Sequence, residues 1–351
     1  MNLPNMREIL RHAYAHPDEP AVFYAGRIDP ASDRLRALGG WDWRPTRAVG
    51  IPGSSNILVA QTMGCPPRFT SDGKEWVSPV ITDPDQVDRL SIPDVREGRT
   101  GDVLQAAERI LAETPDVLVT IPDTAAPLSI AELMWDGTFY EAMLDAPEAV
   151  HALLDKITDF TVRFTREFQC IVGNRLNPCP WPGVWADGPG CYLGDDAMSL
   201  VSPAAHAEFS VPTISRIARE CGPLYYHSCT WRRGYFPNIL AIENVALYNW
   251  NPGNSDDTAV ILREFAGKAV MAPHLTRGMH ADDDALKLGR GFANEVALFE
   301  YMLDSVPDNG CVFFYFSDVC DQRDLIEPIY DLLDARGHTP QAWARKGRLA
   351  A

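Results

Sequence analysis

Two residues with metal-binding side chains, His227 and Cys229, lie at the end of the apolar stretch 224–229. This stretch predicts a short strand, and alternate side chains of a strand point to the same face, so the two should share a face. Imidazole and thiolate are ligands that zinc prefers. A third candidate ligand, Cys320, closes a second apolar stretch that begins at Cys311. If both strands end on the same side of the fold, these side chains predict a catalytic zinc with one open position.

The same pair also has a simpler interpretation. A histidine with satisfied hydrogen bonds often lies in a hydrophobic core, and a buried cysteine usually behaves there as a small apolar residue. The motif alone does not distinguish this arrangement from a metal site, so the rest of the chain has to decide between them.

Composition narrows the classes of function. The chain has 351 residues, 46% of them hydrophobic, and a formal net charge of −17. This charge argues against nucleic acids and anionic membranes as partners, because both attract a basic surface. No apolar stretch approaches the roughly 20 residues of a membrane span, and the N-terminus lacks the pattern of a signal peptide. We therefore expect a cytoplasmic protein whose eight cysteines are reduced thiols, available as ligands.

Short apolar stretches alternate with helical patterns from about residue 101 onwards. The expected strands are 21–25, 116–121, 181–186, 224–229, 245–250, 269–272 and 311–319, and the expected helices are 6–14, 33–38, 102–114, 129–144, 145–170, 202–221, 258–265, 282–306 and 325–336. This alternation predicts parallel βαβ units. Residues 1–100 should add the first strand, loops and hairpins. Because no glycine-rich phosphate motif follows the first strand, we prefer one α/β domain over residues 1–351, a (β/α)8 TIM barrel with an N-terminal helical elaboration, to a doubly wound sheet.

In such a barrel, the active site lies at the carboxyl ends of the strands. Two residues expected there are candidates for catalysis, Asp187 and His274. Asp187 could orient His227 or only cap a turn, and a structural role is equally open for His274. Four more are candidates for substrate binding, with helix capping as the alternative for the aspartate and barrel packing as the alternative for the aromatic residues: Asp123, Trp185, Tyr248 and Asn249.

Several stretches resemble the uroporphyrinogen decarboxylase superfamily, and within it the zinc-dependent, corrinoid-linked methyltransferases that act on thiols. They are residues 145–155, 202–212, 226–230 and the strand that reaches Cys320. The resemblance implies a zinc ion held by His227, Cys229 and Cys320. It also implies methyl transfer between a corrinoid and a zinc-activated thiol or similar small-molecule acceptor. The corrinoid would be methylcobalamin or would arrive on a partner corrinoid protein, since no corrinoid-binding module is visible in this chain.

Two departures from the superfamily limit this interpretation. Uroporphyrinogen decarboxylases carry an arginine-rich loop near the N-terminus, whereas residues 23–29 hold one arginine, so we predict that uroporphyrinogen is not a substrate. The related cobalamin-independent methionine synthases place a carboxylate ligand on the sixth strand, whereas residues 248–251 contain none. The fourth zinc position is left to water, the substrate thiol or a carboxylate from another loop.

Two other classes of function stay open. One is a zinc-dependent demethylase or lyase, in which the metal activates something other than a thiol acceptor. The other is a non-catalytic relative that keeps the barrel as a binding subunit. Stoichiometric zinc would separate the enzymes from the binding subunit, because a binding subunit does not need the metal.

Overall fold

The computed structural model describes residues 6–26, 48–180, 186, 188–230, 232–255, 258–275, 291–316 and 323–338. Apart from one antiparallel hairpin, β3–β4, the paired strands are parallel. The strands are β1 (Ala21–Gly26), β2 (Ala48–Val49), β3 (Pro67–Phe69), β4 (Glu75–Val77), β5 (Leu118–Thr120), β6 (Leu176–Asn177), β7 (Cys191–Gly194), β8 (Leu224–Ser228), β9 (Val245–Trp250), β10 (Val270–Leu275) and β11 (Cys311–Phe316).

The pairing of these strands gives a barrel. One parallel sheet has the order β1-β11-β10-β9-β8-β7, and a second has the order β2-β5-β6. A bridge between Ala125, just after β5, and Gly194, at the end of β7, joins the two sheets. The first strand, β1, pairs in parallel with the last, β11, as the closure of a sheet into a barrel requires. The predicted (β/α)8 barrel is confirmed: its strands are β1, β2, β5 and β7 to β11, and β6 is a short extra strand before β7.

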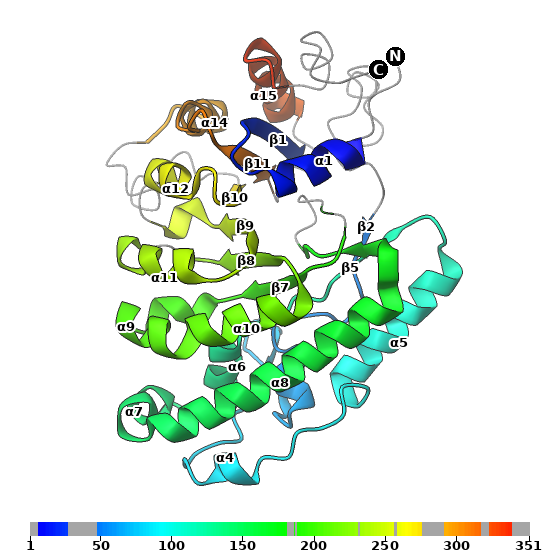
Figure 1. Cartoon of the computed structure of the whole chain (residues 1–351), viewed down its shortest axis with the longest axis vertical. Coiled ribbons are helices and arrows are strands. Elements are labelled where there is room, and N and C mark those ends of the chain that lie inside the picture. The colour runs from blue at the N-terminus through cyan, green and yellow to red at the C-terminus, as the bar shows by residue number, and fades with distance from the viewer. Residues whose placement is uncertain are drawn as a thin grey trace.

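Helices cover the outside of the strands, as Figure 1 shows. They are α1 (Met6–Ala15), α3 (Leu58–Thr62), α4 (Gln86–Arg89), α5 (Gly98–Glu113), α6 (Pro127–Met134), α7 (Phe139–Asp145), α8 (Pro147–Val172), α9 (Pro203–Ala205), α10 (Val211–Cys221), α11 (Phe236–Ala241), α12 (Thr258–Phe265), α14 (Glu295–Asp304) and α15 (Arg323–Ala335). A π-helical turn, His206–Ser210, joins α9 to α10.

The long helix α8 shows how local sequence sets these boundaries. It begins with Pro147, whose fixed φ suits a first helical position, and ends at Gly173, which has a φ of 58°. Its apolar side packs against α5, α6 and α10. The strand β8 is buried along its whole length, as expected for a parallel strand that is covered on both faces.

Most expected elements are present, with two notable differences. The strand β7 was not expected, and the strand expected at 181–186 lies almost wholly outside the described residues. The helix expected at 129–144 is divided into α6 and α7. The helix expected at 33–38 and the first part of that expected at 282–306 also lie outside the described residues.

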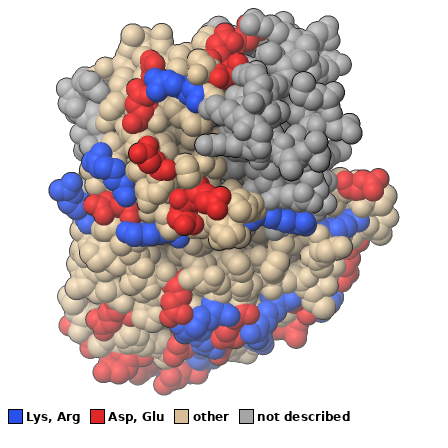
Figure 2. Space-filling view, turned by 45° about the horizontal axis from the view of Figure 1, so that its top comes forward, with Lys and Arg blue, Asp and Glu red and all other residues tan. Residues whose placement is uncertain are grey.

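The helices and the surface bear on the expectations about membranes and nucleic acids. Among the described residues, no helix has the length and apolar character that a membrane crossing needs. On the face shown in Figure 2, Lys and Arg side chains lie singly or next to Asp and Glu, and the described residues there form no continuous basic area.

Candidate metal centre

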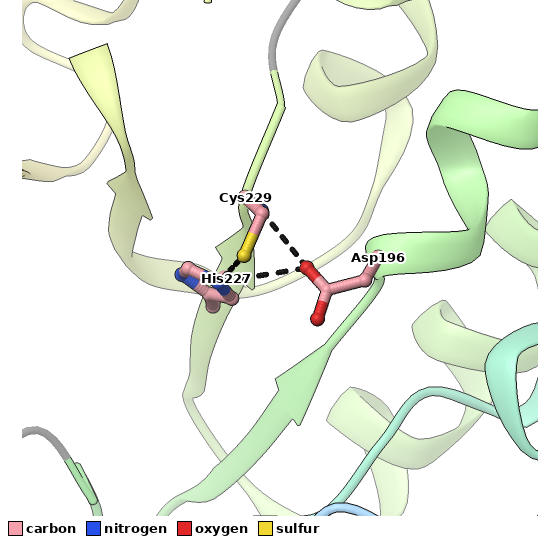
Figure 3. A group of neighbouring side chains, drawn as sticks. All are labelled: Asp196, His227 and Cys229. Atoms are coloured by element: carbon pink, nitrogen blue, oxygen red, sulfur yellow. Dashed lines mark hydrogen bonds and ion pairs between the residues drawn. The ribbon is translucent and has the colours of Figure 1, made fainter. Parts of the chain in front are cut away.

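Three side chains meet at the carboxyl ends of β7 and β8: Asp196, His227 and Cys229 (Figure 3). The ligand atoms that they offer all lie within 4.8 Å of one another. The Nε2 atom of His227 is 3.2 Å from the Sγ atom of Cys229 and 3.6 Å from Oδ1 of Asp196. His227 is buried, Cys229 half-buried and Asp196 exposed, so the group opens towards solvent on the carboxylate side.

Strand register explains why these residues meet. Gly194 of β7 pairs with His227 of β8, and His227 pairs in turn with Asn249 of β9. The chain therefore leaves β7 directly beside His227, where the N–H of Asp195 donates to the His227 carbonyl at 2.8 Å. The next residue, Asp196, accepts the Cys229 N–H on Oδ1 at 2.9 Å. These backbone contacts hold the carboxylate over the imidazole and the thiol.

Asn249 determines which nitrogen of His227 is available. The Nδ2 of Asn249 donates to the carbonyl of Ala272 on β10 at 2.5 Å, so its Oδ1 faces Nδ1 of His227, 2.6 Å away. Because Oδ1 can only accept, Nδ1 must carry the proton, and this network assigns the lone pair to Nε2. Burial lowers the pKa of His227 below its usual value, which keeps the ring neutral. A neutral imidazole with Nε2 directed at Cys229 and Asp196 is the form that binds a metal.

The surroundings of Cys229 strongly favour the protonated thiol over the thiolate. Burial, the nearby charge and hydrogen bond of Asp196, and the charge of Asp123 together raise its pKa to about 12. A neighbouring cation would reverse this effect, since a metal-bound thiol loses its proton. Soft sulfur, imidazole nitrogen and carboxylate oxygen form a donor set that suits zinc.

Asp123 belongs to the same surroundings. It follows β5, and its N–H donates to Ser54 Oγ at 3.0 Å. Burial, together with the negative charge of Asp196, raises the pKa of its half-buried carboxyl to about 6. A carboxyl with a pKa this close to neutrality is often found at a functional site.

Asp195 is fully buried and fixes the chain next to the centre. Its Oδ2 accepts hydrogen bonds from His206 Nε2 at 2.9 Å, Ser210 Oγ at 3.0 Å and Tyr226 OH at 3.1 Å. Nδ1 of the same histidine lies 3.2 Å from the amide nitrogen of Asn238, which leaves the ring proton on Nε2. Asp195 thus connects the end of β7 to β8 and to the π-helical turn, a type of helix often found at functional sites.

Of the other predicted site residues, one contacts the candidate metal centre and another points away from it. Asn249 contacts His227, as described above, but Tyr248 lies on the opposite face of β9, fully buried against Phe265 of α12 with ring centroids 4.6 Å apart. The structure therefore does not bring Tyr248 to the centre. His274 is half-buried near the carboxyl end of β10, on the same strand face as Ala272.

Three predicted residues, Cys320, Asp187 and Trp185, lie outside the described residues, and their roles stay predictions. Conversely, neither Asp195 nor Asp196 was among the predicted site residues. The available signal was a pair of carboxylates directly after the short apolar stretch 191–193, which is too short to predict a strand. The cysteines of the described residues are all free thiols.

Part of the chain is similar to uroporphyrinogen decarboxylases. Residues 49–171 match the family model for "Uroporphyrinogen decarboxylase (URO-D)". A uroporphyrinogen decarboxylase from Xanthomonas campestris pv. campestris is 27% identical over 176 residues, which are 48% of this chain and 45% of that relative. The chain thus spans about half the length of the curated relatives it matches.

Two further matches are methyltransferases from Methanosarcina mazei. A methylated-thiol–coenzyme M methyltransferase is 27% identical over 179 residues, 49% of this chain and 44% of the relative. A solved methyltransferase structure superposes with a TM-score of 0.62 over 95% of this chain and 98% of the other, at 12% identity, and so supports the fold. The resemblance to the uroporphyrinogen decarboxylase superfamily is confirmed, with similarity to its methyltransferase branch.

Proposed function

We propose that this chain is a zinc-dependent methyltransferase that moves a methyl group between a corrinoid and a thiol. The observation that carries the proposal is the convergence of His227 Nε2, Cys229 Sγ and Asp196 Oδ1 within 4.8 Å at the carboxyl ends of two barrel strands. This is the end of the barrel at which enzymes of this fold build their active sites.

The residues divide between holding the metal and orienting its ligands. His227 and Cys229 would bind zinc directly, and Cys320 is the predicted third ligand. We propose that the carboxylate of Asp196 takes the fourth position in the absence of substrate and that the substrate thiol replaces it there. Bound zinc supplies a positive charge that favours the thiolate form of a substrate thiol near neutral pH. Asn249 keeps Nε2 of His227 directed at the site.

The reaction itself needs little further chemistry from the protein. The sulfur of the thiol forms a bond to the methyl carbon while the bond between methyl and donor breaks. The bonding electron pair remains on the donor, and the thiol proton passes to solvent. Similarity to a methylated-thiol–coenzyme M methyltransferase supports a thiol acceptor. We propose methylcobalamin, or a methylated corrinoid on a partner protein docked over the barrel mouth, as the donor.

A direct assay is the demethylation of methylcobalamin, followed by its visible absorption, with simple thiols as acceptors. Chelator-treated protein should be inactive, and stoichiometric zinc should restore the reaction and yield the methyl thioether. Cys170→Ser is a suitable control because this cysteine is exposed and lies on α8, and it should behave as wild type. Thioether formation that is unaffected by complete removal of the metal would contradict the proposal.

A further inference from the structure

His206 is completely buried at the start of the π-helical turn and links the segments that follow β7 and β8. Its Nε2 lies 2.9 Å from Oδ2 of Asp195, the residue after β7. Its Nδ1 lies 3.2 Å from Nδ2 of Asn238, on the helix α11 that follows β8. Burying a polar ring is unfavourable unless its nitrogens are hydrogen-bonded, so these two contacts together fix the ring in place.

The segments that follow β7 and β8 are also tied to each other directly. The Tyr235 hydroxyl donates to the Val201 carbonyl, and Asn238 Nδ2 donates to the Pro203 carbonyl at 2.6 Å. In Figure 1, α9 and α11 accordingly lie next to each other on the outside of the barrel. One segment carries the carboxylate of the candidate centre and the other carries its thiol, so these contacts affect the spacing of two candidate ligands.

The turn that carries Asp196 is held on both sides of this residue. Asp195 accepts hydrogen bonds from three buried side chains, and the N–H of Ala197 donates to Ser129 Oγ on α6 at 3.1 Å. The Asp196 side chain itself is exposed, and its Oδ1 accepts the N–H of Cys229. Because an exposed side chain has several rotamers open to it, the position of its backbone decides whether this carboxylate reaches the metal.

We infer that His206 is a positioning residue for the metal centre. Through Asp195, it holds the next residue, Asp196, where the carboxylate can bind the metal. This inference rests on the proposed function. Residues that orient a metal ligand from outside typically change metal affinity about 10–100-fold. His206 acts on the backbone of a ligand and not on its side chain, so we expect an effect at the lower end of this range.

A double-mutant cycle separates this role from a general effect on stability. Zinc affinity, measured by competition with a chromophoric chelator, is compared in wild type, His206→Asn, Asp196→Ala and the double variant. The shorter side chain in His206→Asn no longer reaches Asp195, so zinc affinity should fall roughly tenfold. In the Asp196→Ala background, the same change should lower it less than about twofold, because the carboxylate that His206 positions is gone.

Two further variants test the contact with Asp195 itself. His206→Gln keeps an N–H donor at the position of Nε2 and should retain most of the zinc affinity. Ser210→Ala removes a donor 3.0 Å from Asp195 Oδ2 with little change in volume, so it should fold even if His206→Asn does not. Its zinc affinity should fall roughly threefold, as expected for one hydrogen bond, and again only where Asp196 is present.

His151→Asn is the matched control. His151 is an exposed residue of α8 that touches the same π-helical turn from outside. Its ring stacks on Phe209 with centroids 4.6 Å apart, and its Nε2 lies 3.4 Å from Oε1 of Glu208. This variant should bind zinc as wild type does.

The outcomes separate this inference from the proposed function. If wild type binds zinc but His206→Asn weakens binding equally with and without the Asp196 carboxylate, or does not weaken it, His206 has no positioning role and the metal centre stands. Equal losses in His206→Gln and His206→Asn would also overturn the inference, because the contact with Asp195 would not matter. If wild type binds no zinc, the proposed function fails and this inference fails with it.

Discussion

At the scale of single residues, the contact between Asn249 and His227 determines which ring nitrogen of His227 faces the candidate centre. The amide of Asn249 is oriented by the Ala272 carbonyl and leaves one tautomer available to His227. Partners that orient a metal-bound histidine typically affect metal affinity about 10–100-fold. Among the described residues, Asn249 orients His227, and the orienting role predicted for Asp187 stays a prediction.

Replacing Asn249 tests this assignment. In Asn249→Ala, we expect zinc affinity to fall roughly 10–100-fold, measured by competition with a chromophoric chelator. Asn249→Asp keeps an oxygen that accepts the Nδ1–H proton and should retain most of the affinity. Equal zinc affinity in wild type and Asn249→Ala would show that the ring is oriented by other contacts.

Asp123 gives a prediction for pH dependence, to be measured on chelator-treated protein. Its pKa is raised from 3.8 to about 6 in the folded chain. The folded state therefore binds more protons than the unfolded state between these values, and the free energy of unfolding should fall as pH rises through this window. Asp123→Asn removes this contribution. Its stability relative to wild type should increase between pH 4 and 7 (by up to about 3 kcal/mol) in urea unfolding. A difference that does not change with pH would contradict the raised pKa.

At the scale of elements, two adjacent carboxylates after β7 have different tasks. Asp195 is buried and accepts three hydrogen bonds, whereas Asp196 is exposed and faces the metal ligands. Asp195→Ala should destabilise metal-free protein by about 3–5 kcal/mol, because buried donors lose their acceptor. Asp196→Ala should cost about 1 kcal/mol or less, yet weaken zinc binding. Urea unfolding and chelator competition measure both effects, and similar stability losses in the two variants would contradict this division.

The sequence predicted β8 well and β7 not at all, and the reason is physical. The strand begins with Leu224 and two tyrosines directly after Gly222 and Pro223, so its start is clearly marked. The strand β7 has four residues, all buried, and is too short to show a period. Asp196 was missed because its position depends on the pairing of Gly194 with His227, which is a long-range contact without a local pattern.

Alternation along a strand also explains why Tyr248 lies away from the centre. The expectation placed both Tyr248 and Asn249 at the substrate, but neighbouring side chains on a strand point to opposite faces. Asn249 faces His227, and Tyr248 faces the helix layer. For two neighbouring residues at a strand end, the sequence indicates that the strand end lies near the site. It does not indicate which of the two side chains points into the site, because that depends on the packing of helices such as α12.

At the scale of the whole molecule, similarity to uroporphyrinogen decarboxylases covers about half of the chain and leaves the substrate open. We predict that the purified protein forms no coproporphyrinogen from uroporphyrinogen, because residues 23–29 hold a single arginine to bind the acidic side chains of that substrate. Chromatographic analysis of the oxidised porphyrins measures this, with a uroporphyrinogen decarboxylase as the positive control. Stepwise decarboxylation by this chain would mean that other residues bind the acidic groups.

We propose that this barrel binds one catalytic zinc ion through His227, Cys229 and Cys320, and the zinc content of the purified protein tests this proposal. Elemental analysis of purified wild type should give about one zinc per chain. Cys229→Ser and Cys320→Ser should each lose most of it while retaining the far-ultraviolet circular dichroism of the fold. Cys311→Ser is the matched control, since Cys311 is buried at the amino end of β11, and it should keep its zinc. Stoichiometric zinc in Cys229→Ser or Cys320→Ser, or its loss in Cys311→Ser alone, would contradict this ligand set.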